Sequence, residues 1–452
     1  MKIFYGDSNS ILFLSGLSLG LLFISNVAFG NAIMVLVVFG VPLNQLILAF
    51  LFLICALFGL IRLPTGYPLL LYIWMIFGLF IWLPIGLMNH GIVAGRDATQ
   101  LLDAIAFILA FSIFTKMHTQ YIAIILEKLL FIGLTLEFLD RLVLFQFSDV
   151  TVASLHNVKL FGGTVGSSVI VVSAFWFGVV MRNSISTFSS RYMMLLSFIL
   201  VLMLQNRFLY VGMIFTILVY FFIVRPNFLS RSLLYKIFIG ILLVAIIEVY
   251  IGSFIGYLLN LLPNSDYIES NRLFKFGIES FSLSGIFDLL ATGFGIENEL
   301  YSGSAGGVFQ RLGWWYNLMI IMFSDLTTLI FGMGYGVILT DLIGVSPIRE
   351  PHNSFISVFC RNGLILFIIW IAFHLTLVWK SFGCLLKKMA FTTEHKLLLV
   401  SLLTIISTYI CGVVEPAFEN PPISISTYIF IGLSAVLISR IKLKERLSRS
   451  AT

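Results

Sequence analysis

The sequence predicts an all-α polytopic membrane protein of about 12 transmembrane helices with a large, partly helical, outward-facing loop. Two observations carry this prediction. Hydrophobic residues make up 60% of the 452 residues and charged residues only 11%, whereas soluble domains carry roughly a quarter charged residues. The few charges also lie between apolar runs of about 20 residues, the length of helix that spans the ~30 Å hydrocarbon layer. Such a chain is not a soluble enzyme, a secreted disulfide scaffold or a nucleic-acid-binding module.

The predicted helices fall into two groups on either side of the loop. A bundle of about nine spans occupies residues 1–261, the loop 262–352, three further spans 353–440 and a basic tail 441–452. The first apolar run is long enough to cross once, or to break near Asn26 and Gly30 into two short helices, and these alternatives place the N-terminus on opposite sides. The expected spans are residues 11–41, 43–61, 69–87, 98–115, 121–147, 168–181, 192–204, 208–224, 237–261, 354–379, 397–414 and 423–439.

The basic residues predict which side of the membrane each connection faces. Lysine and arginine concentrate in cytoplasmic connections, and five of them lie between Arg440 and Arg449 at the C-terminus. Alternating crossings then place the large loop outside. Residues 263–351 contain four basic and nine acidic residues. The excess of basic residues that gives the net charge of +6 is therefore expected in the cytoplasmic connections. An anionic substrate outside must therefore be bound by a few arginines in particular positions.

Two arginines outside the large loop are candidates for anion contacts. Arg207, with Gln205 and Asn206, divides an apolar stretch into two short spans, which draws Arg207 below the outer surface. There its guanidinium can reach a phosphate at headgroup level. A snorkelling arginine at a tight turn is the equally weighted alternative. Arg96, in an earlier outer connection, either contacts an anion or pairs with its neighbour Asp97.

Two motifs in the large loop combine aromatic residues and glycines. Arg311 is followed by Trp314 and Trp315, whose rings can stack on sugars or anchor a helix at the membrane interface. The later motif FGMGYG contains Gly334 and Gly336. Its alternating glycines permit close backbone approach to a ligand or a tight turn, and the turn is the favoured interpretation.

The segment that enters the next span contains the most specific candidates. It reads PIREPHNS and includes Arg349, Glu350, His352 and Asn353. We expect His352 at the outer mouth of the span, where a histidine can act as a base near neutral pH. Glu350 or Asn353 can fix its tautomer. The alternative is a helix cap without chemistry, which is weakened by the arginines, aromatic residues and glycines that precede it in the same loop.

The sequence predicts neither a metal site nor a disulfide. Glu297 and Glu299 form a close acidic pair in the loop, but two carboxylates without a third ligand are poor support for a metal site. The cysteines lie in predicted spans or in a cytoplasmic connection. They are expected to be free thiols.

Four motifs, in this order, resemble the O-antigen ligase and Wzy-type O-antigen polymerase superfamily. They read NRFLYVG at residues 206–212, QRLGWW at 310–315, FGMGYG at 331–336 and EPHNSFISVFCRNG at 350–363. The resemblance covers mainly the C-terminal half, and the plan of spans agrees with it. The mid-chain arginine departs from the expected Ser-Arg-Gly pattern, because Arg207 is followed by phenylalanine.

The resemblance implies a membrane glycosyltransferase of the GT-C type, which works without a metal or other cofactor. Its donor would be a glycan on undecaprenyl pyrophosphate and its acceptor a sugar hydroxyl, at the outer face of the bacterial inner membrane. It implies that His352 is the base or positions the acceptor, and that Arg311 and Arg207 bind the pyrophosphate. Arg96 and Arg349 are further candidates for that contact.

The acceptor is either another lipid-linked repeat unit or a lipid A-core. The net acidic loop weakly favours the first, and hence a surface-polysaccharide polymerase, because a phosphorylated core would favour a basic outer rim. A ligase is the alternative. From another class, a flippase or transporter of lipid-linked glycans also needs many helices and intramembrane arginines, but it does not need a large outer region that ends in His-Asn.

Overall fold

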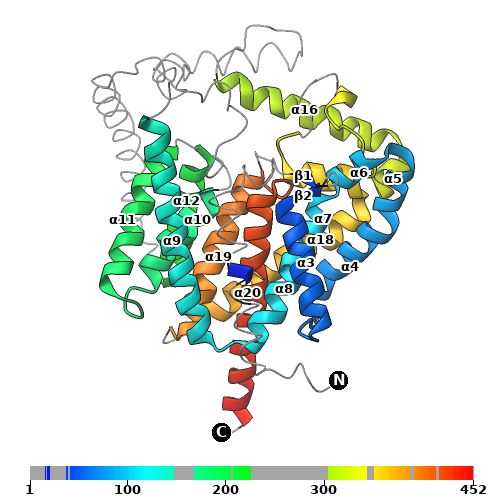
Figure 1. Ribbon diagram of the computed structural model, residues 1–452. Helices are drawn as coiled ribbons and strands as arrows, with labels where there is room; N and C mark the ends of the chain where they lie inside the picture. The colour runs from blue at the N-terminus through cyan, green and yellow to red at the C-terminus, as the bar shows by residue number, and fades with distance from the viewer. Residues whose placement is uncertain are drawn as a thin grey trace.

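The computed structural model describes residues 16, 18–20, 37–38, 41–146, 167–204, 207–224, 304–343, 351–386, 391–413 and 417–450. Nearly all of this part is helical, as Figure 1 shows. The exception is a short antiparallel pair formed by β1 (Val37–Val38) and β2 (Val41–Pro42). The predicted spans 11–41 and 237–261 lie largely or wholly outside the described residues.

Five helical stretches in the described part are long and apolar enough to cross a membrane, so the prediction of a helical membrane protein is confirmed. They are Leu69–His90, Ile92–Lys116, Ser354–Leu386, Thr393–Gly412 and Pro421–Ser450. Four shorter apolar helices accompany them: α3 (Leu43–Leu57), α10 (Ser167–Val180), α11 (Thr187–Leu204) and α12 (Arg207–Val224). The long helix α9 (Thr119–Gln146) carries Glu127, Lys128 and Glu137, and is not among the five.

Two of the predicted spans are interrupted. Residues 69–90 form α4 (Leu69–Phe77), a π-helical turn (Gly78–Trp82) and α5 (Leu83–His90). Pro84 is the second residue after this turn and has no N–H to donate to it, which explains a local change of helical pitch. The next stretch divides into α6 (Ile92–Asp97), α7 (Thr99–Asp103) and α8 (Ile105–Lys116), so it starts before the expected residue 98.

The large loop is helical in its described part, as predicted. It contains α16 (Ser304–Ser324) and α17 (Leu326–Phe331), followed by a 3-10 turn at Asp341–Ile343. Asp325 caps α17 by accepting hydrogen bonds from the hydroxyl and the amide of Thr328, at 2.7 and 2.8 Å. These bonds hold the pKa of Asp325 below its ordinary value. The cap fixes the direction in which the chain leaves α16.

The C-terminal helix α20 (Pro421–Ser450) is the centre of the bundle. It packs against α8, α18 (Ser354–Leu386) and α19 (Thr393–Gly412), and its first 18 residues, through Ile438, are buried. Figure 1 shows its basic end extending beyond the other helices. Arg440 anchors that end, because its guanidinium donates to the carbonyls of Phe114 (2.6 Å) and Met117 (2.5 Å) where α8 ends.

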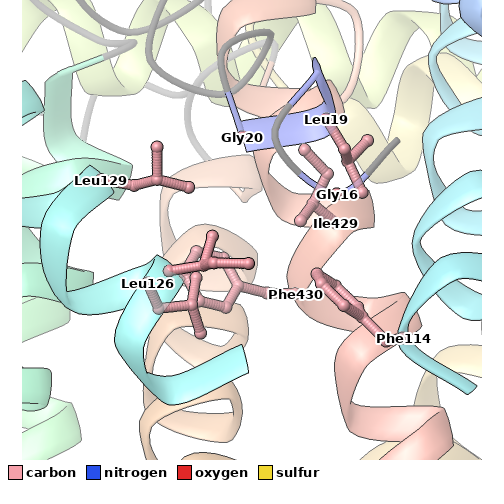
Figure 2. A pocket seen from close by; sticks show the side chains of 9 residues that line it. Gly16, Leu19, Gly20, Phe114, Leu126, Leu129, Ile429 and Phe430 are labelled. Carbon is pink, nitrogen blue, oxygen red and sulfur yellow. The ribbon is translucent and has the colours of Figure 1, made fainter. Parts of the chain in front are cut away.

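A small pocket lies where residues 16–20 meet α8, α9 and α20. Figure 2 shows that side chains such as Leu19, Phe114, Leu129 and Phe430 line it. Its volume is about 20 Å³, which holds no more than one water molecule, and its lining offers no polar side chain to hold that water. We interpret it as a packing gap in the bundle.

Close packing of α20 on α8 predicts that Gly432→Val is destabilising. A Cβ at Gly432 would lie 2.7 Å from Ala110 Cβ and 3.0 Å from the Phe107 carbonyl oxygen, so the helices must separate at a cost of about 1–3 kcal/mol. The matched control is Gly383→Val in α18, where an added Cβ meets no atom within 4 Å. Thermal unfolding of the detergent-purified variants checks this. Equal midpoints for the two variants would contradict the observed packing.

Candidate functional site

The N-terminal end of α18 brings together Asn353 and Trp315, two of the residues that the sequence singles out. Asn353 caps the helix, because its Oδ1 accepts from the Ile356 amide at 3.0 Å. Trp315, on α16, donates its indole N–H to the Pro351 carbonyl at 2.6 Å. Helix α16 therefore packs against the segment that leads into α18. The capping interpretation of Asn353 also applies, because the bond to Ile356 is a helix cap.

His352 has an unusual backbone conformation at this mouth. Its φ is +50°, and among non-glycine residues few adopt a left-handed conformation outside functional or tightly constrained positions. The imidazole is half-buried, and its ring centroid lies 6.3 Å from that of Trp314. Trp314 itself is buried. The segment thus presents one imidazole and one indole side by side, with the indole fixed by packing.

Arg311 lies on α16 one turn before the two tryptophans. Positions 311, 314 and 315 share one face of a helix because they are three and four residues apart. The Arg311 side chain is half-buried. The face of α16 that contacts Pro351 and His352 therefore also carries the cation Arg311.

The glycine-rich motif is a turn that packs into a break in α18. Gly363 has φ +71° and ψ 178°, which interrupts the helix and turns carbonyls away from their usual partners. The Met333 amide donates to the Cys360 carbonyl at 2.7 Å, and the Gly334 amide to the Arg361 carbonyl at 3.0 Å. The loop thus satisfies backbone groups that the break exposes. These contacts agree with the structural interpretation of the motif.

The same loop is held from the other side by a buried ion pair. Arg361 Nη1 lies 3.0 Å from Asp97 Oδ2, and the two side chains are 0% and 2% exposed. Asp97 Oδ2 also accepts from the Gly336 amide at 3.1 Å. Asp97 therefore joins Arg361 of α18 to Gly336 of the glycine-rich loop.

Further buried polar contacts surround this junction. Tyr335 Oη donates to Asn362 Oδ1 at 2.9 Å, and Ser354 Oγ donates to Glu419 Oε2 at 2.5 Å. Asp103 accepts from Gln45 Nε2 at 3.1 Å and from the Ser424 hydroxyl. Sequence reasoning did not single out Asp103. A signal existed, since an acidic residue inside an apolar span is a functional candidate by default.

The remaining predicted site residues are described only in part or not at all. Arg207 is the first residue of α12 and Arg96 belongs to α6, but the structure does not describe their side chains. Helix α11 ends at Leu204 and helix α12 begins at Arg207, which is where the sequence predicts the division between two spans. Arg349 and Glu350 lie outside the described residues. Their part in a site stays a prediction.

The described side chains offer no obvious metal centre. In this part of the chain, no three His, Cys, Asp or Glu residues gather in a group that could hold a metal ion. The four cysteines are buried and none of them is in a disulfide. No protein-family model matches the chain, and no curated protein matches it.

The crossing of the glycine loop and α18 predicts a strong effect of Gly363→Ala. A Cβ there would collide with the Ile330 carbonyl oxygen and the Gly332 amide. The matched control is Gly66→Ala, which has φ +74° but no atom within 4 Å of its added Cβ. Both variants carry the cost of a left-handed alanine, so the crossing itself should cost Gly363→Ala about 1–3 kcal/mol more. Thermal unfolding is the measurement, and equal losses would refute the close crossing.

Proposed function

We propose that the chain is a membrane glycosyltransferase of the O-antigen ligase and polymerase superfamily. It transfers an undecaprenyl-pyrophosphate-linked oligosaccharide to a sugar hydroxyl at the outer face of the bacterial inner membrane. The observation that carries the proposal is His352 at the mouth of α18, in a left-handed conformation beside Trp314 and on the same side as Arg311. A capping turn needs no histidine with a positive φ.

The chemistry of glycan transfer suits these side chains. Attack of a hydroxyl on the anomeric carbon requires removal of the hydroxyl proton. His352 either accepts this proton or positions the acceptor for the attack. The departing pyrophosphate needs charge stabilisation but no strong acid, and Arg311 supplies it together with Arg207, Arg349 and Arg96. Trp314 and Trp315 provide aromatic faces for sugar rings. In-line attack inverts the anomeric configuration, and no metal takes part.

The proposed membrane arrangement has about 12 spans of the GT-C type, with His352 on the periplasmic side. Its support is the position of the basic residues in the described bundle. Lys116 bonds to the Gly59 carbonyl at 3.3 Å, Lys380 lies 4.0 Å over the Tyr67 ring and Arg440 binds the end of α8. These cations occupy the end of the bundle opposite to His352, which the positive-inside rule assigns to the cytoplasm.

The preferred acceptor is another lipid-linked repeat unit, so we favour a surface-polysaccharide polymerase. The purified protein, supplied with lipid-linked repeat units and lipid A-core, distinguishes the candidates by product. Longer lipid-linked chains support a polymerase and a glycan on the core supports a ligase. A flippase forms no new glycosidic bond, so unchanged glycans would contradict the proposal.

Substitutions of His352 separate chemistry from backbone conformation. Asparagine tolerates a left-handed conformation better than most residues, so His352→Asn should fold like the wild type yet lose transfer by roughly 10²–10⁴-fold, the usual contribution of a general base. His352→Gly relieves the backbone and should be equally inactive. Wild-type transfer rates for both variants, with expression and insertion intact, would mean that His352 has only a conformational role.

A further inference from the structure

A polar cleft lies at the opposite end of the bundle from His352. It has a volume of about 610 Å³ and opens between the α10–α11 connection, α12 and the start of α19. Its cations come from connections far apart in sequence, which the fold brings to one place. The lining residues that matter here are Val179, Arg182, Asn183, Met194, Tyr220 and Lys396.

The lining is positively charged. Arg182 is exposed and Lys396 is half-buried, with Lys396 Nζ donating to Ser184 Oγ at 2.8 Å. No carboxylate belongs to the lining that the structure describes. Glu394 is close in sequence, but two residues along a helix turn its side chain to the opposite face, where Lys444 Nζ contacts its Oε1 at 2.5 Å. The cleft is therefore a site for an anion.

The cleft is also amphipathic. Its lining combines the half-buried apolar side chains of Val179 and Met194 with the donors of Arg182, Asn183 and Lys396, of which Arg182 and Asn183 are exposed. It lies at the cytoplasmic end, because Arg182 and Lys396 belong to connections that share this end of the bundle with the basic extension of α20 (Figure 1). Half-buried apolar side chains beside exposed cations suit the boundary between acyl chains and headgroups.

We propose that this cleft binds the phosphate of an anionic lipid of the cytoplasmic leaflet. Arg182 offers a planar fork for two phosphate oxygens, and Lys396 adds a point charge that Ser184 orients. The Asn183 amide and the Tyr220 hydroxyl are further donors, and the first methylenes of the lipid lie along Val179 and Met194. The site is at the opposite end from the proposed glycan transfer, and it does not rest on that activity.

The test measures lipid binding by the detergent-purified full chain. Its two readouts are native mass spectrometry and the shift of the thermal unfolding midpoint. Phosphatidylglycerol is compared with phosphatidylcholine of the same acyl chains, and inorganic phosphate is added in a third arm. We expect phosphatidylglycerol alone to raise the midpoint. Arg182→Gln and Lys396→Gln should each weaken its binding about tenfold, the loss of one charge-assisted contact, and the double variant should abolish the shift.

Two controls separate charge from structure. Arg446→Gln removes an exposed cation of α20 that does not line the cleft. Ser184→Ala removes the hydrogen bond to Lys396 but keeps the charge of the lysine. Both variants should retain lipid binding within about threefold of the wild type. Binding that survives in the Arg182 and Lys396 double variant would overturn the proposal. An equal midpoint shift with inorganic phosphate alone would overturn the lipid assignment and indicate a soluble phosphate ligand instead.

Discussion

The contact between the glycine loop and the break in α18 is the constraint on which the His352 end of the molecule depends. A membrane-embedded helix normally satisfies its own backbone N–H and C=O groups with helical hydrogen bonds. At Gly363 these hydrogen bonds are interrupted. The loop amides of Met333 and Gly334 replace the lost partners, and Asp97 ties both the loop and Arg361 to α6. Because that junction fixes the first turns of α18, it also fixes where the helix starts and therefore where His352 lies.

A buried ion pair at such a junction specifies geometry more than it stabilises the fold. Removing two charges from water costs several kcal/mol per ion, which good geometry only recovers in part. The carboxylate of Asp97 has two donors from different elements, the Arg361 guanidinium and the Gly336 amide. Lys444 and Glu394 form a contrasting pair at the edge of the bundle, where the lysine side chain is 67% and the glutamate side chain 12% exposed, so solvent screens this pair more than the buried one.

The sequence predicts the helical membrane class and the approximate ends of most described helices because apolar length is a strong local signal. It also predicts that the Arg311 to Trp315 segment and His352 belong to one region, since both lie in the outward loop. It does not predict the break at Gly363, because a single glycine inside an apolar run is compatible with a continuous helix. The pairing of Asp97 with Arg361 joins residues 264 positions apart, and no local pattern specifies such a partner.

A double-mutant cycle on Asp97 and Arg361 tests the account most directly. The free energy of unfolding is measured by titration with SDS for Asp97→Asn, Arg361→Gln and the combined variant. If the pair fixes the junction, each single change leaves one buried charge uncompensated and costs about 3–5 kcal/mol, while the combined variant loses clearly less than the sum. Additive losses would show that the two side chains act independently, and would contradict the central role of this contact.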